Sequence, residues 1–245
     1  METPYGIGGD SDLVDLRAGD RGRNVEVVVL ESEERTIDGR DGETTIRSGV
    51  VADETGRLPF TDWAARPELR EGSAFRFEEV SIREFRGVPQ VNLSEFTTVT
   101  PLGRSIEVDD NAQRLPIGEA VAAGGLFDVE VVGNVLEVRD GSGLIERCPD
   151  CGRVLQNGQC RSHGDVDGED DMRVKAIVDD GTGTVTAMLD RELTEAVYGG
   201  TMEAAMTAAR DAMDKEVVAD EIREQVVGRE YRVRGNLSVD DYGAN

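Results

Sequence analysis

The sequence predicts a mostly β protein made of two copies of one small barrel domain. The first observation behind this prediction is a set of short apolar runs in which β-branched residues alternate with polar ones. Two such runs are "NVEVVVLESEERTI" (24–37) and "LFDVEVVGNVLEV" (126–138), and each is placed at the start of a longer β-rich stretch. Helical periodicity is confined to a few segments, so strands are expected to form the core.

The second observation is an internal repeat. The segment "SGVVADETGRLPFTDW" (48–63) resembles "VKAIVDDGTGTVTAMLD" (174–190), and in both a strand, an acidic glycine turn and a second strand follow one another. Further on, "GSAFRFEEVSIREFRG" (72–87) resembles "GREYRVRGNLSVDDYG" (228–243). The repeat period is about 130 residues, so one domain is predicted to follow another of the same kind.

Each copy reads strand, strand, tight turn, strand, helix, strand, turn, strand. This order is typical of the five-stranded Greek-key barrel called the OB-fold. The predicted domains are 1–103 and 126–245, with an acidic linker over 104–125 in which a short helix is also considered. The helical link before the fourth strand is short in the first copy. In the second copy it is a helical segment over 190–227, in which Thr201 is expected to cap one helix.

The second copy is expected to be truncated. When the copies are aligned on Gly87 and Gly243, the first continues with "VPQVNLSEFTTVT", whereas the second has only "AN" left. We therefore expect the fifth strand of the second barrel to be missing and the sequence to be a fragment of a longer chain.

The charge composition indicates a surface adapted to high salt. The net charge is -24 and, of the 27 basic residues, only Lys175 and Lys215 are lysines. Carboxylates hold water and cations, so a halophilic host is predicted. Because the Debye length falls to about 3 Å at 1 M salt, the acidic composition does not exclude nucleic-acid binding. The opening segment lacks a signal-peptide core and no apolar run approaches membrane length, so we expect a cytoplasmic protein with no membrane partner.

All three cysteines and the single histidine fall in "CPDCGRVLQNGQCRSH" (148–163). Cys148 and Cys151 form a C-x2-C pair, and Cys160 and His163 form a C-x2-H pair. This is the spacing of two knuckles that hold one tetrahedral zinc ion. Four ligands leave no open position, so the zinc ribbon, predicted over 146–165, is expected to be structural. The alternative is a redox C-x-x-C motif with an unrelated cysteine and histidine.

Glycines follow both ligand pairs. Gly152 and Gly164 are expected to let the backbone turn tightly around the sulfur and imidazole ligands.

Three segments together resemble the archaeal replication protein A family in its haloarchaeal form. They are "DLRAGD" (15–20), "VADETGRLPFTDW" (51–63) and the ribbon followed by "VKAIVDDGTG". The resemblance implies a halophilic archaeon and single-stranded DNA binding in DNA replication, repair and recombination, without catalysis. It also implies other replication protein A subunits or associated proteins as partners. One departure is Asp190, which stands where the first copy has Trp63.

The strand "RLPFTDW" separates core residues from binding residues. Leu58 and Phe60 share one face, whereas Arg57, Thr61 and Trp63 share the other. An OB barrel fills its interior with apolar side chains, so Leu58 and Phe60 are predicted to be core and Trp63 to stack on DNA bases. The alternative for a lone tryptophan is core packing.

Other DNA-binding candidates in the first copy lie on neighbouring strands. Phe75 and Phe77 share parity and are predicted to be core. The expected contacts are two arginines that point outward by parity and three residues near the turn between strands four and five: Arg47, Arg76, Arg83, Phe85 and Arg86.

In the second copy, one strand again alternates, with an apolar face formed by Met172, Val174, Ala176 and Val178. The DNA-binding candidates lie on the opposite face of that strand, on the fourth strand and at the turn that corresponds to Phe85: Arg173, Lys175, Arg232, Arg234 and Tyr242.

Two other functions remain open. An RNA-binding or translation-associated OB-fold protein would use the same barrels, and so would a scaffold for oligomerisation or partner binding. An enzyme is not expected, because the chain has no histidine or cysteine outside the ribbon and no G-x-x-x-x-G-K loop.

Overall fold

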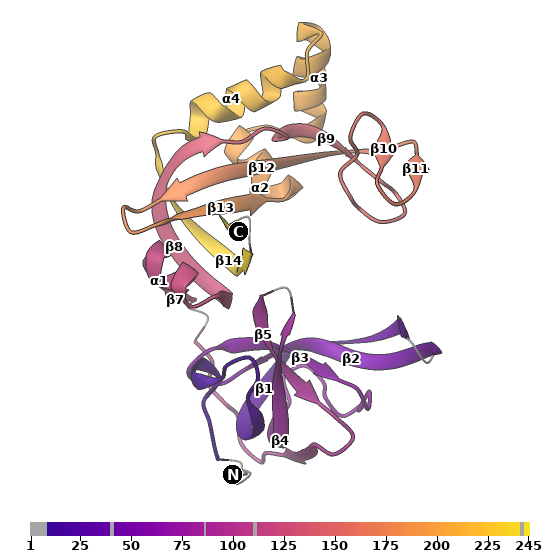
Figure 1. Cartoon of the computed structure of the whole chain (residues 1–245), viewed down its shortest axis with the longest axis vertical. Helices are drawn as coiled ribbons and strands as arrows, with labels where there is room; N and C mark the ends of the chain where they lie inside the picture. The colour runs from indigo at the N-terminus through magenta and orange to yellow at the C-terminus, as the bar shows by residue number, and fades with distance from the viewer. Residues whose placement is uncertain (1–8, 40–41, 86, 110–111, 241–242) are drawn as a thin grey trace, which may run out of the picture. The chain divides into compact units, whose positions relative to one another are not determined.

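The structure is a computed structural model that describes residues 9–39, 42–85, 87–109, 112–240 and 243–245. Its chain divides into two compact units. The first contains Met1–Leu115, Ala122–Glu130 and Arg234–Asp240, and the second contains Pro116–Val121, Val131–Val233 and Asp241–Asn245. The first unit holds the first β-barrel, and most of the second β-barrel lies in the second unit (Figure 1).

The first barrel has the strand order of an OB-fold. Its elements are η1 (Leu13–Asp15), β1 (Arg21–Gly39), β2 (Gly42–Ala52), β3 (Arg57–Asp62), β4 (Ala74–Phe85), β5 (Val88–Leu93) and β6 (Thr98–Pro101). Hydrogen-bonded neighbours follow the path β3-β2-β1-β4-β5, and parallel pairing of β3 with β5 closes the ring. Strand β6 adds to the edge of β4. The predicted five-stranded barrel is therefore confirmed.

The core of this barrel follows the period-2 alternation of its strands. Leu58 and Phe60 on β3 are buried, and so are Phe75 and Phe77 on β4, as the sequence predicted. They pack in one cluster with apolar residues of β1, β2 and β5. Side chains that alternate with them face outward, which leaves the outer surface of the sheet free for polar residues.

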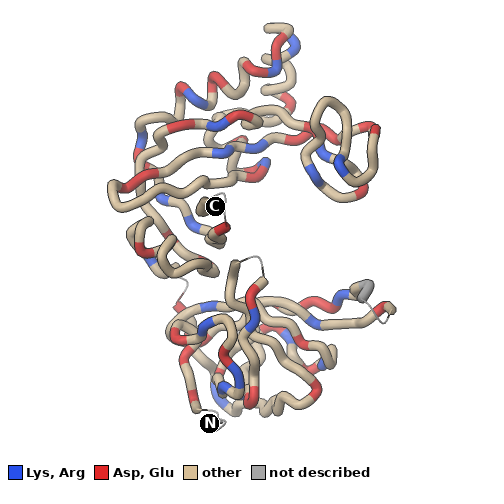
Figure 2. Tube along the Cα trace, viewed as in Figure 1, with Lys and Arg blue, Asp and Glu red and all other residues tan. Residues whose placement is uncertain are grey.

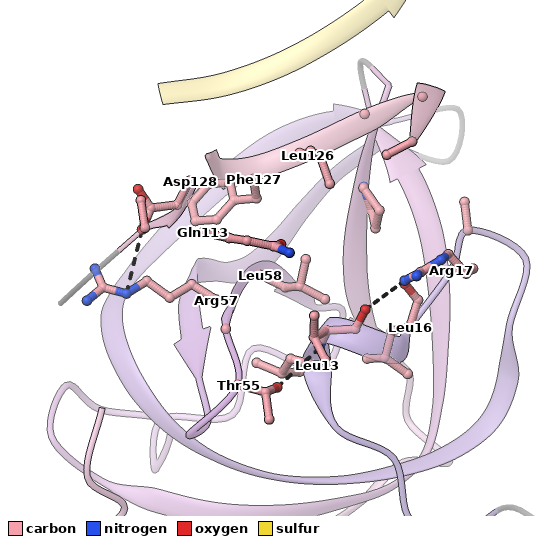
Figure 3. Close-up of a pocket in the computed structure, with 18 of the residues that line it drawn as sticks. Leu13, Leu16, Arg17, Thr55, Arg57, Leu58, Gln113, Leu126, Phe127 and Asp128 are labelled. Carbon is pink, nitrogen blue, oxygen red and sulfur yellow. Dashed lines mark hydrogen bonds and ion pairs between the residues drawn. The ribbon is translucent and has the colours of Figure 1, made fainter. Parts of the chain in front are cut away.

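A short helical turn closes one end of the first barrel. Leu13 and Leu16, from η1 and the residue after it, pack into the same core cluster as Leu58 (Figure 3). Backbone N–H groups of the turn are capped by the acidic glycine loop, since Leu13 N–H donates to Asp53 Oδ2 at 2.7 Å and Val14 N–H donates to Thr55 Oγ1 at 3.3 Å. This loop therefore joins β2 to β3 and also holds η1.

The second barrel repeats the same path. Its strands are β7 (Gln113–Arg114), β8 (Gly125–Val138), β9 (Gly143–Arg147), β10 (Gln159–Cys160), β11 (Gly164–Asp165), β12 (Glu169–Asp179), β13 (Thr184–Leu189), β14 (Glu230–Asp240) and β15 (Gly243–Ala244). The order β13-β12-β8-β14-β15 matches β3-β2-β1-β4-β5 strand for strand. Strand β15 lies beside β13 and so takes the position of β5.

Part of the predicted linker belongs to the second unit instead. Helix α1 (Ile117–Ala122) precedes β8, as η1 precedes β1. Ile117 N–H donates to Asp180 Oδ2 at 2.8 Å, and Gly118 N–H donates to Thr182 Oγ1 at 2.9 Å. The sequence predicted a linker with a short helix in this region, and α1 is a helix of six residues within it.

Three helices connect β13 to β14, as the sequence predicted. They are α2 (Arg191–Tyr198), α3 (Met202–Ala212) and α4 (Glu216–Val226). The Thr201 side chain accepts a hydrogen bond from Ala204 N–H, which confirms it as a cap, and Asp190 caps α2 in the same way. No helix in the described part of the chain is long and apolar enough to cross a membrane.

Candidate nucleic-acid interface and metal centre

Trp63 lies at the end of β3 with its ring partly exposed. The side chain is 45% exposed, and its indole Nε1–H donates to Asn92 Oδ1 at 2.9 Å. The Trp63 backbone N–H also donates to the Leu93 carbonyl at 3.0 Å. The core alternative is thus excluded, because both bonds anchor the tryptophan at β5 and leave part of the ring open to solvent.

A row of polar side chains supports this tryptophan. Thr61 and Asn92 are register partners on β3 and β5, and both are buried. Gln90 Nε2 donates to Thr61 Oγ1 at 2.7 Å, and Asn92 Nδ2 lies 3.5 Å from the Gln90 carbonyl. Sequence reasoning missed Gln90 and Asn92. The signal was present in "VPQVNL", where they alternate with the buried Val91 and Leu93.

Strand β4 brings two predicted residues to the same face. Arg83 is the register partner of Gln90, and Phe85 is the partner of Val88. Register partners in an antiparallel pair project on the same side of the sheet. Phe85 is 61% exposed and Arg83 is also exposed, so both share the face that carries Trp63. Arg86 lies outside the described residues.

Arg57 belongs to the same face by alternation along β3. Its guanidinium donates to the Asp109 carbonyl at 3.2 Å. This hydrogen bond holds Arg57 at the start of β3, on the face that it shares with Pro59 and Thr61.

Arg47 does not point outward, and that prediction was wrong. It is the register partner of Asp62 on β3, in a series that continues through Gly49 with Phe60 and Val51 with Leu58 on the core side. Its side chain is only 14% exposed and bonds Glu34 at 3.1 Å. The pairing of β2 with β3 is unbroken from Arg47 to Ala52, so Arg47 shares the face of the buried Val51.

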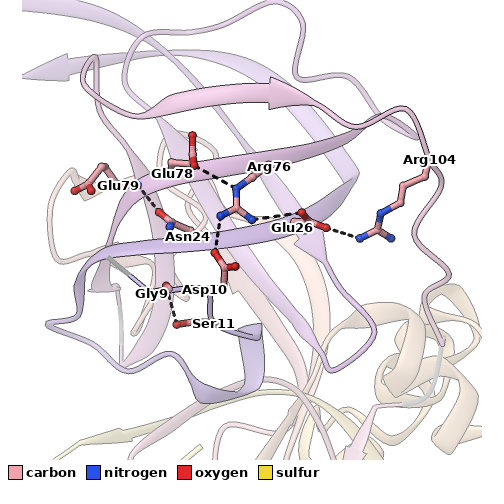
Figure 4. Close-up of polar contacts among 9 residues, drawn as sticks. All are labelled: Gly9, Asp10, Ser11, Asn24, Glu26, Arg76, Glu78, Glu79 and Arg104. Atoms are coloured by element: carbon pink, nitrogen blue, oxygen red, sulfur yellow. Dashed lines mark hydrogen bonds and ion pairs between the residues drawn. The ribbon is translucent and has the colours of Figure 1, made fainter. Parts of the chain in front are cut away.

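Arg76 is also engaged away from the Trp63 face. It lies on β4 opposite Glu26 of β1 and bonds three carboxylates, at 2.5 Å to Asp10, 3.4 Å to Glu26 and 3.2 Å to Glu78 (Figure 4). These hydrogen bonds, that of Asp10 foremost, raise the pKa of the Arg76 guanidinium. Arg76 therefore ties strands together rather than presenting an unpaired charge.

The second barrel gathers basic side chains on the outer face of β12. Met172, Val174, Ala176 and Val178 are buried, which confirms the predicted apolar face. Arg173 and Lys175 project on the other side. A Cβ atom on Gly141 would lie 3.1 Å from Arg173 Nη2 and 3.7 Å from Lys175 Nζ, so both side chains extend over this loop.

Like charges surround these two residues. Burial lowers the pKa of Lys175, and the nearby Arg173 and Arg139 lower it further, whereas Asp140 opposes them. Burial and Arg147 likewise lower the pKa of Arg173. Acidic residues are distributed along both barrels (Figure 2), so a group of neighbouring cations stands out as a candidate binding site for an anion.

Strand β13 adds an exposed apolar residue next to this group. Met188 is the register partner of Lys175 and is 52% exposed. Aligned on the acidic glycine turns, Met188 corresponds to Thr61, and Asp190 corresponds to Trp63. Asp190 is occupied as the cap of α2, so the second barrel has no aromatic residue at the Trp63 position.

Arg232 and Arg234 are exposed on β14, with the shared parity that the sequence predicted. Arg234 forms a bidentate pair with Asp128, at 2.6 and 2.8 Å. Tyr242 lies outside the described residues.

The four predicted metal ligands come together in the ribbon between β9 and β12. All four ligand atoms lie within 4.8 Å of one another. Cys148 Sγ is 3.4 Å from His163 Nδ1, Cys151 Sγ is 3.6 Å from Cys160 Sγ, and Cys160 Sγ is 3.7 Å from His163 Nδ1. With Zn–S bonds of about 2.3 Å, tetrahedral ligands are separated by about 3.5–3.8 Å. The donor set and its spacing therefore fit a metal ion.

The backbone of the ribbon prepares the ligands. Gly152 and Gly164 have φ of +67° and +74°, the left-handed conformation expected of the knuckle glycines. The backbone N–H groups of Ser162 and His163 hold the pKa of the Cys160 thiol at about 6. A thiolate is the metal-binding form of cysteine, so this hydrogen bonding favours metal binding.

An ion-pair group fixes the base of the ribbon. The buried Asp171 on β12 accepts hydrogen bonds from Arg147 on β9 and from Arg191 on α2, the latter at 2.7 Å. The ribbon is therefore attached to strands and a helix of the second barrel at one point.

Comparison with curated proteins finds a single-stranded DNA binding protein that resembles part of this chain. No protein-family model matches the chain. Single-stranded DNA binding protein Ssb of Saccharolobus solfataricus is 37% identical over 78 residues, which cover 31% of this chain and 53% of that protein. The chain thus spans about half the length of this relative.

Solved structures show weaker similarity. A chain of a replication protein A heterotrimer bound to ssDNA is 12% identical, with 96% of this chain and 66% of that chain covered and a TM-score of 0.39. A replication factor A related protein from Methanobacterium thermoautotrophicum is 28% identical, with 42% and 96% covered and a TM-score of 0.34. These TM-scores are low, so the fold assignment rests on strand order and register.

Proposed function

We propose that this chain binds single-stranded DNA without sequence specificity and without catalysis, and that it acts in DNA replication, repair and recombination. The observation that carries the proposal is the half-exposed Trp63, tethered by Asn92 on the outer face of an OB barrel. Stacking of a base on an aromatic ring contributes about 1–3 kcal/mol and tolerates any sequence. The similarity to a curated single-stranded DNA binding protein supports the same conclusion.

The remaining residues of the Trp63 face fit a strand that passes across β3, β5 and β4. Gln90, which is held by Thr61, provides a polar contact beside the ring, and the exposed Arg83 provides a positive charge for a phosphate. Phe85, exposed at the end of β4, gives a second aromatic ring. Arg57, on the same face by parity, extends the contacts along β3.

We propose that the second barrel contributes mainly phosphate contacts. Arg173 and Lys175 lie together over Gly141, and Arg139 lowers the pKa of Lys175 by its charge. A phosphate would relieve this repulsion, because it brings negative charge to groups whose protonated form is disfavoured. Arg232 and Arg234 on β14 are further candidates for backbone contacts.

We propose zinc as the metal of the Cys148, Cys151, Cys160 and His163 site. Three thiolates and one imidazole are the ligands of structural zinc, and these four leave no position for substrate. When bound, the ion would supply cross-linking of the ribbon rather than chemistry. We also propose that 1–103 and 126–245 are the two domains, with other replication protein A subunits or associated proteins as partners.

The proposal is tested by fluorescence anisotropy with three labelled probes in about 2 M KCl, the regime in which charges are screened within a few ångströms. The probes are a dT oligonucleotide, the matching U oligonucleotide and a hairpin duplex. We expect the chain to bind the dT oligonucleotide, and we expect that an excess of unlabelled duplex does not displace it. Preference for the U oligonucleotide would favour the RNA-binding alternative, and no binding to any probe would contradict the proposal.

A further inference from the structure

The most exposed aromatic ring in the described part of the first barrel belongs to neither Trp63 nor Phe85. Phe96 is 81% exposed, more than Phe85 or Trp63. It lies in the turn Ser94–Thr97, which joins β5 to β6. A single exposed apolar residue is common on protein surfaces, so exposure alone indicates nothing.

Hydrogen bonds within this turn hold Phe96 in place. Ser94 N–H donates to Thr97 Oγ1 at 3.0 Å, and Thr97 N–H donates back to the Ser94 carbonyl at 3.1 Å. Phe96 N–H itself donates to Ser94 Oγ at 3.2 Å. These hydrogen bonds fix the backbone of Phe96, so the exposed ring is attached to an ordered turn.

A buried ion pair connects this turn to the turn that carries Trp63. The Asp62 carboxylate is fully buried and accepts hydrogen bonds from Ala64 N–H at 3.2 Å and from Arg66 N–H at 2.6 Å. The Arg66 guanidinium bonds Asp62 Oδ1 at 2.5 Å and, through Nη2, the carbonyls of Ser94 at 2.8 Å and Thr97 at 2.9 Å.

Burying two charges is unfavourable unless their hydrogen bonds are satisfied. Here Arg66 forms hydrogen bonds with Asp62, the residue before Trp63, and with Ser94 and Thr97, the two ends of the turn that contains Phe96. The pair therefore fixes the two aromatic residues relative to one another.

The backbones of Trp63 and Phe96 lie near one another, so both rings can reach one DNA strand. Trp63 N–H bonds the Leu93 carbonyl, and Phe96 follows Leu93 by three residues, which span at most about 10 Å. Stacked bases of one strand are about 3.4 Å apart. The reach of the two side chains adds to this span, so a base on Trp63 and a base on Phe96 would be within several nucleotides of one another on one strand.

We infer that Phe96 is a further base-stacking residue in addition to Trp63 and Phe85, which continues the Trp63 face beyond the end of β5, and that Asp62 and Arg66 are positioning residues for Trp63 and Phe96. This inference rests on the proposed function. The neighbours of Phe96 in the turn are Ser94, Glu95 and Thr97, so the ring stands among polar side chains. A protein partner would need a contiguous apolar patch, whereas a base needs only a ring face.

Fluorescence tests the position directly, because Trp63 is the only tryptophan of the chain. In Trp63→Phe/Phe96→Trp, all tryptophan emission arises from position 96. Titration with a dT oligonucleotide in molar KCl is expected to quench this emission with the same midpoint as anisotropy. Unchanged emission while anisotropy reports binding would overturn the inference and leave the proposed function standing. No binding by the parent would contradict the proposed function itself.

Affinity gives a second readout in the parent background. Phe96→Ala is expected to weaken binding about 5- to 100-fold, Phe96→Tyr to retain it and Phe96→Leu to lose nearly as much as Phe96→Ala. If Phe96→Leu instead binds like the parent, or if Phe96→Ala abolishes a self-association seen in sedimentation, the ring is a hydrophobic contact and the inference is wrong.

The positioning role is tested by coupling. Arg66→Lys keeps the charge but not the fork that reaches both carbonyls, and it is expected to weaken binding in a folded protein. That loss should shrink when Trp63 and Phe96 are both alanine. An equal loss in both backgrounds would show that Arg66 acts only through general stability.

Discussion

Asp53 and Asp180 occupy equivalent positions in the two barrels, because each carboxylate caps the helical turn that closes its own barrel. Asp53 Oδ2 accepts from Leu13 N–H at 2.7 Å, and Asp180 Oδ2 accepts from Ile117 N–H at 2.8 Å. Thr55 and Thr182 complete the two loops with the same hydroxyl contact to the next N–H group. In both copies, the acidic glycine loop therefore connects two strands and also caps the helical turn that precedes the barrel.

Asp180→Asn is predicted to destabilise the second barrel by about 0.5–2 kcal/mol near neutral pH, because hydrogen bonds to an ionised carboxylate are stronger than hydrogen bonds to a neutral amide oxygen. Burial opposes ionisation of Asp180, but hydrogen bonds from the Thr182 hydroxyl and from backbone N–H groups of Ile117, Thr182 and Gly183 bring its pKa down from 3.8 to about 2. Thermal unfolding in molar KCl, with Asp179→Asn as a neighbouring control, measures the difference.

The pH dependence of that difference follows from the lowered pKa. The stabilisation is complete above the unfolded value of 3.8 and is lost as the pH falls through the folded value of about 2. The gap in stability between the parent and Asp180→Asn should therefore be largest at pH 6 and shrink as acid approaches pH 2. If the difference in stability between the parent and Asp180→Asn stays constant over this range, the charge of the carboxylate does not stabilise the contact between the loop and α1.

Sequence patterns correctly predicted those features that are determined by residues close together in the sequence. Alternation on β3 and β12 predicted the core faces, since buried Phe60 and Val174 each stand between outward-facing residues. The spacing of Cys148 and His163 predicted a metal site for the same reason, because knuckles are local turns.

Long-range contacts decided where the predictions were incomplete or wrong. Arg76 meets Asp10 and Glu26, which are far away in sequence, so its engagement could not be read from strand parity. Trp63 and Asn92 are 29 residues apart, and their hydrogen bond depends on the parallel pairing of β3 with β5. Arg47 was assigned to the wrong face of β2, because the unbroken pairing of β2 with β3 sets it opposite Asp62 and on the side of the buried Val51.

One zinc ion per chain is predicted for protein purified without added metal, as measured by elemental analysis. Cys151→Ser should abolish binding and unfold the ribbon, because structural zinc supplies the free energy that folds such small segments. Hydrogen exchange is expected to show lost protection in 146–165 and unchanged protection in β1 to β5, whose core cluster contains no ribbon residue. Ser162→Ala is the control, since its hydroxyl is not a ligand. Loss of protection throughout the first barrel would contradict a local role for the metal.

The two lysines of the chain provide a matched test of phosphate contacts. Lys175 lies among basic residues on β12, whereas Lys215 pairs with Glu146 at 2.7 Å. If Lys175 neutralises one phosphate, Lys175→Gln should lower the log–log salt slope by about 0.7, and Lys215→Gln should leave it unchanged. The slopes come from anisotropy with a dT oligonucleotide between low and molar KCl. Equal slopes for both variants would remove Lys175 from the interface.

Binding in high salt is predicted to depend more on Trp63 than on any single arginine. The net charge of -24 repels DNA at low salt, and at about 2 M KCl screening removes long-range attraction, so short-range stacking must carry the affinity. Trp63→Ala should weaken binding by about 1–3 kcal/mol there, whereas Trp63→Phe should keep most of it. Arg57→Gln should cost less.

Asn92→Ala separates the ring from its tether. It removes the acceptor for the indole N–H but leaves the ring, so it should weaken binding by less than Trp63→Ala and add little to it in the double variant. Anisotropy gives the affinities, circular dichroism checks folding, and quenching of the single tryptophan follows stacking in the parent and in Asn92→Ala. If folded Trp63→Ala binds like the parent, the outer face of β3, β5 and β4 is not the DNA-binding surface.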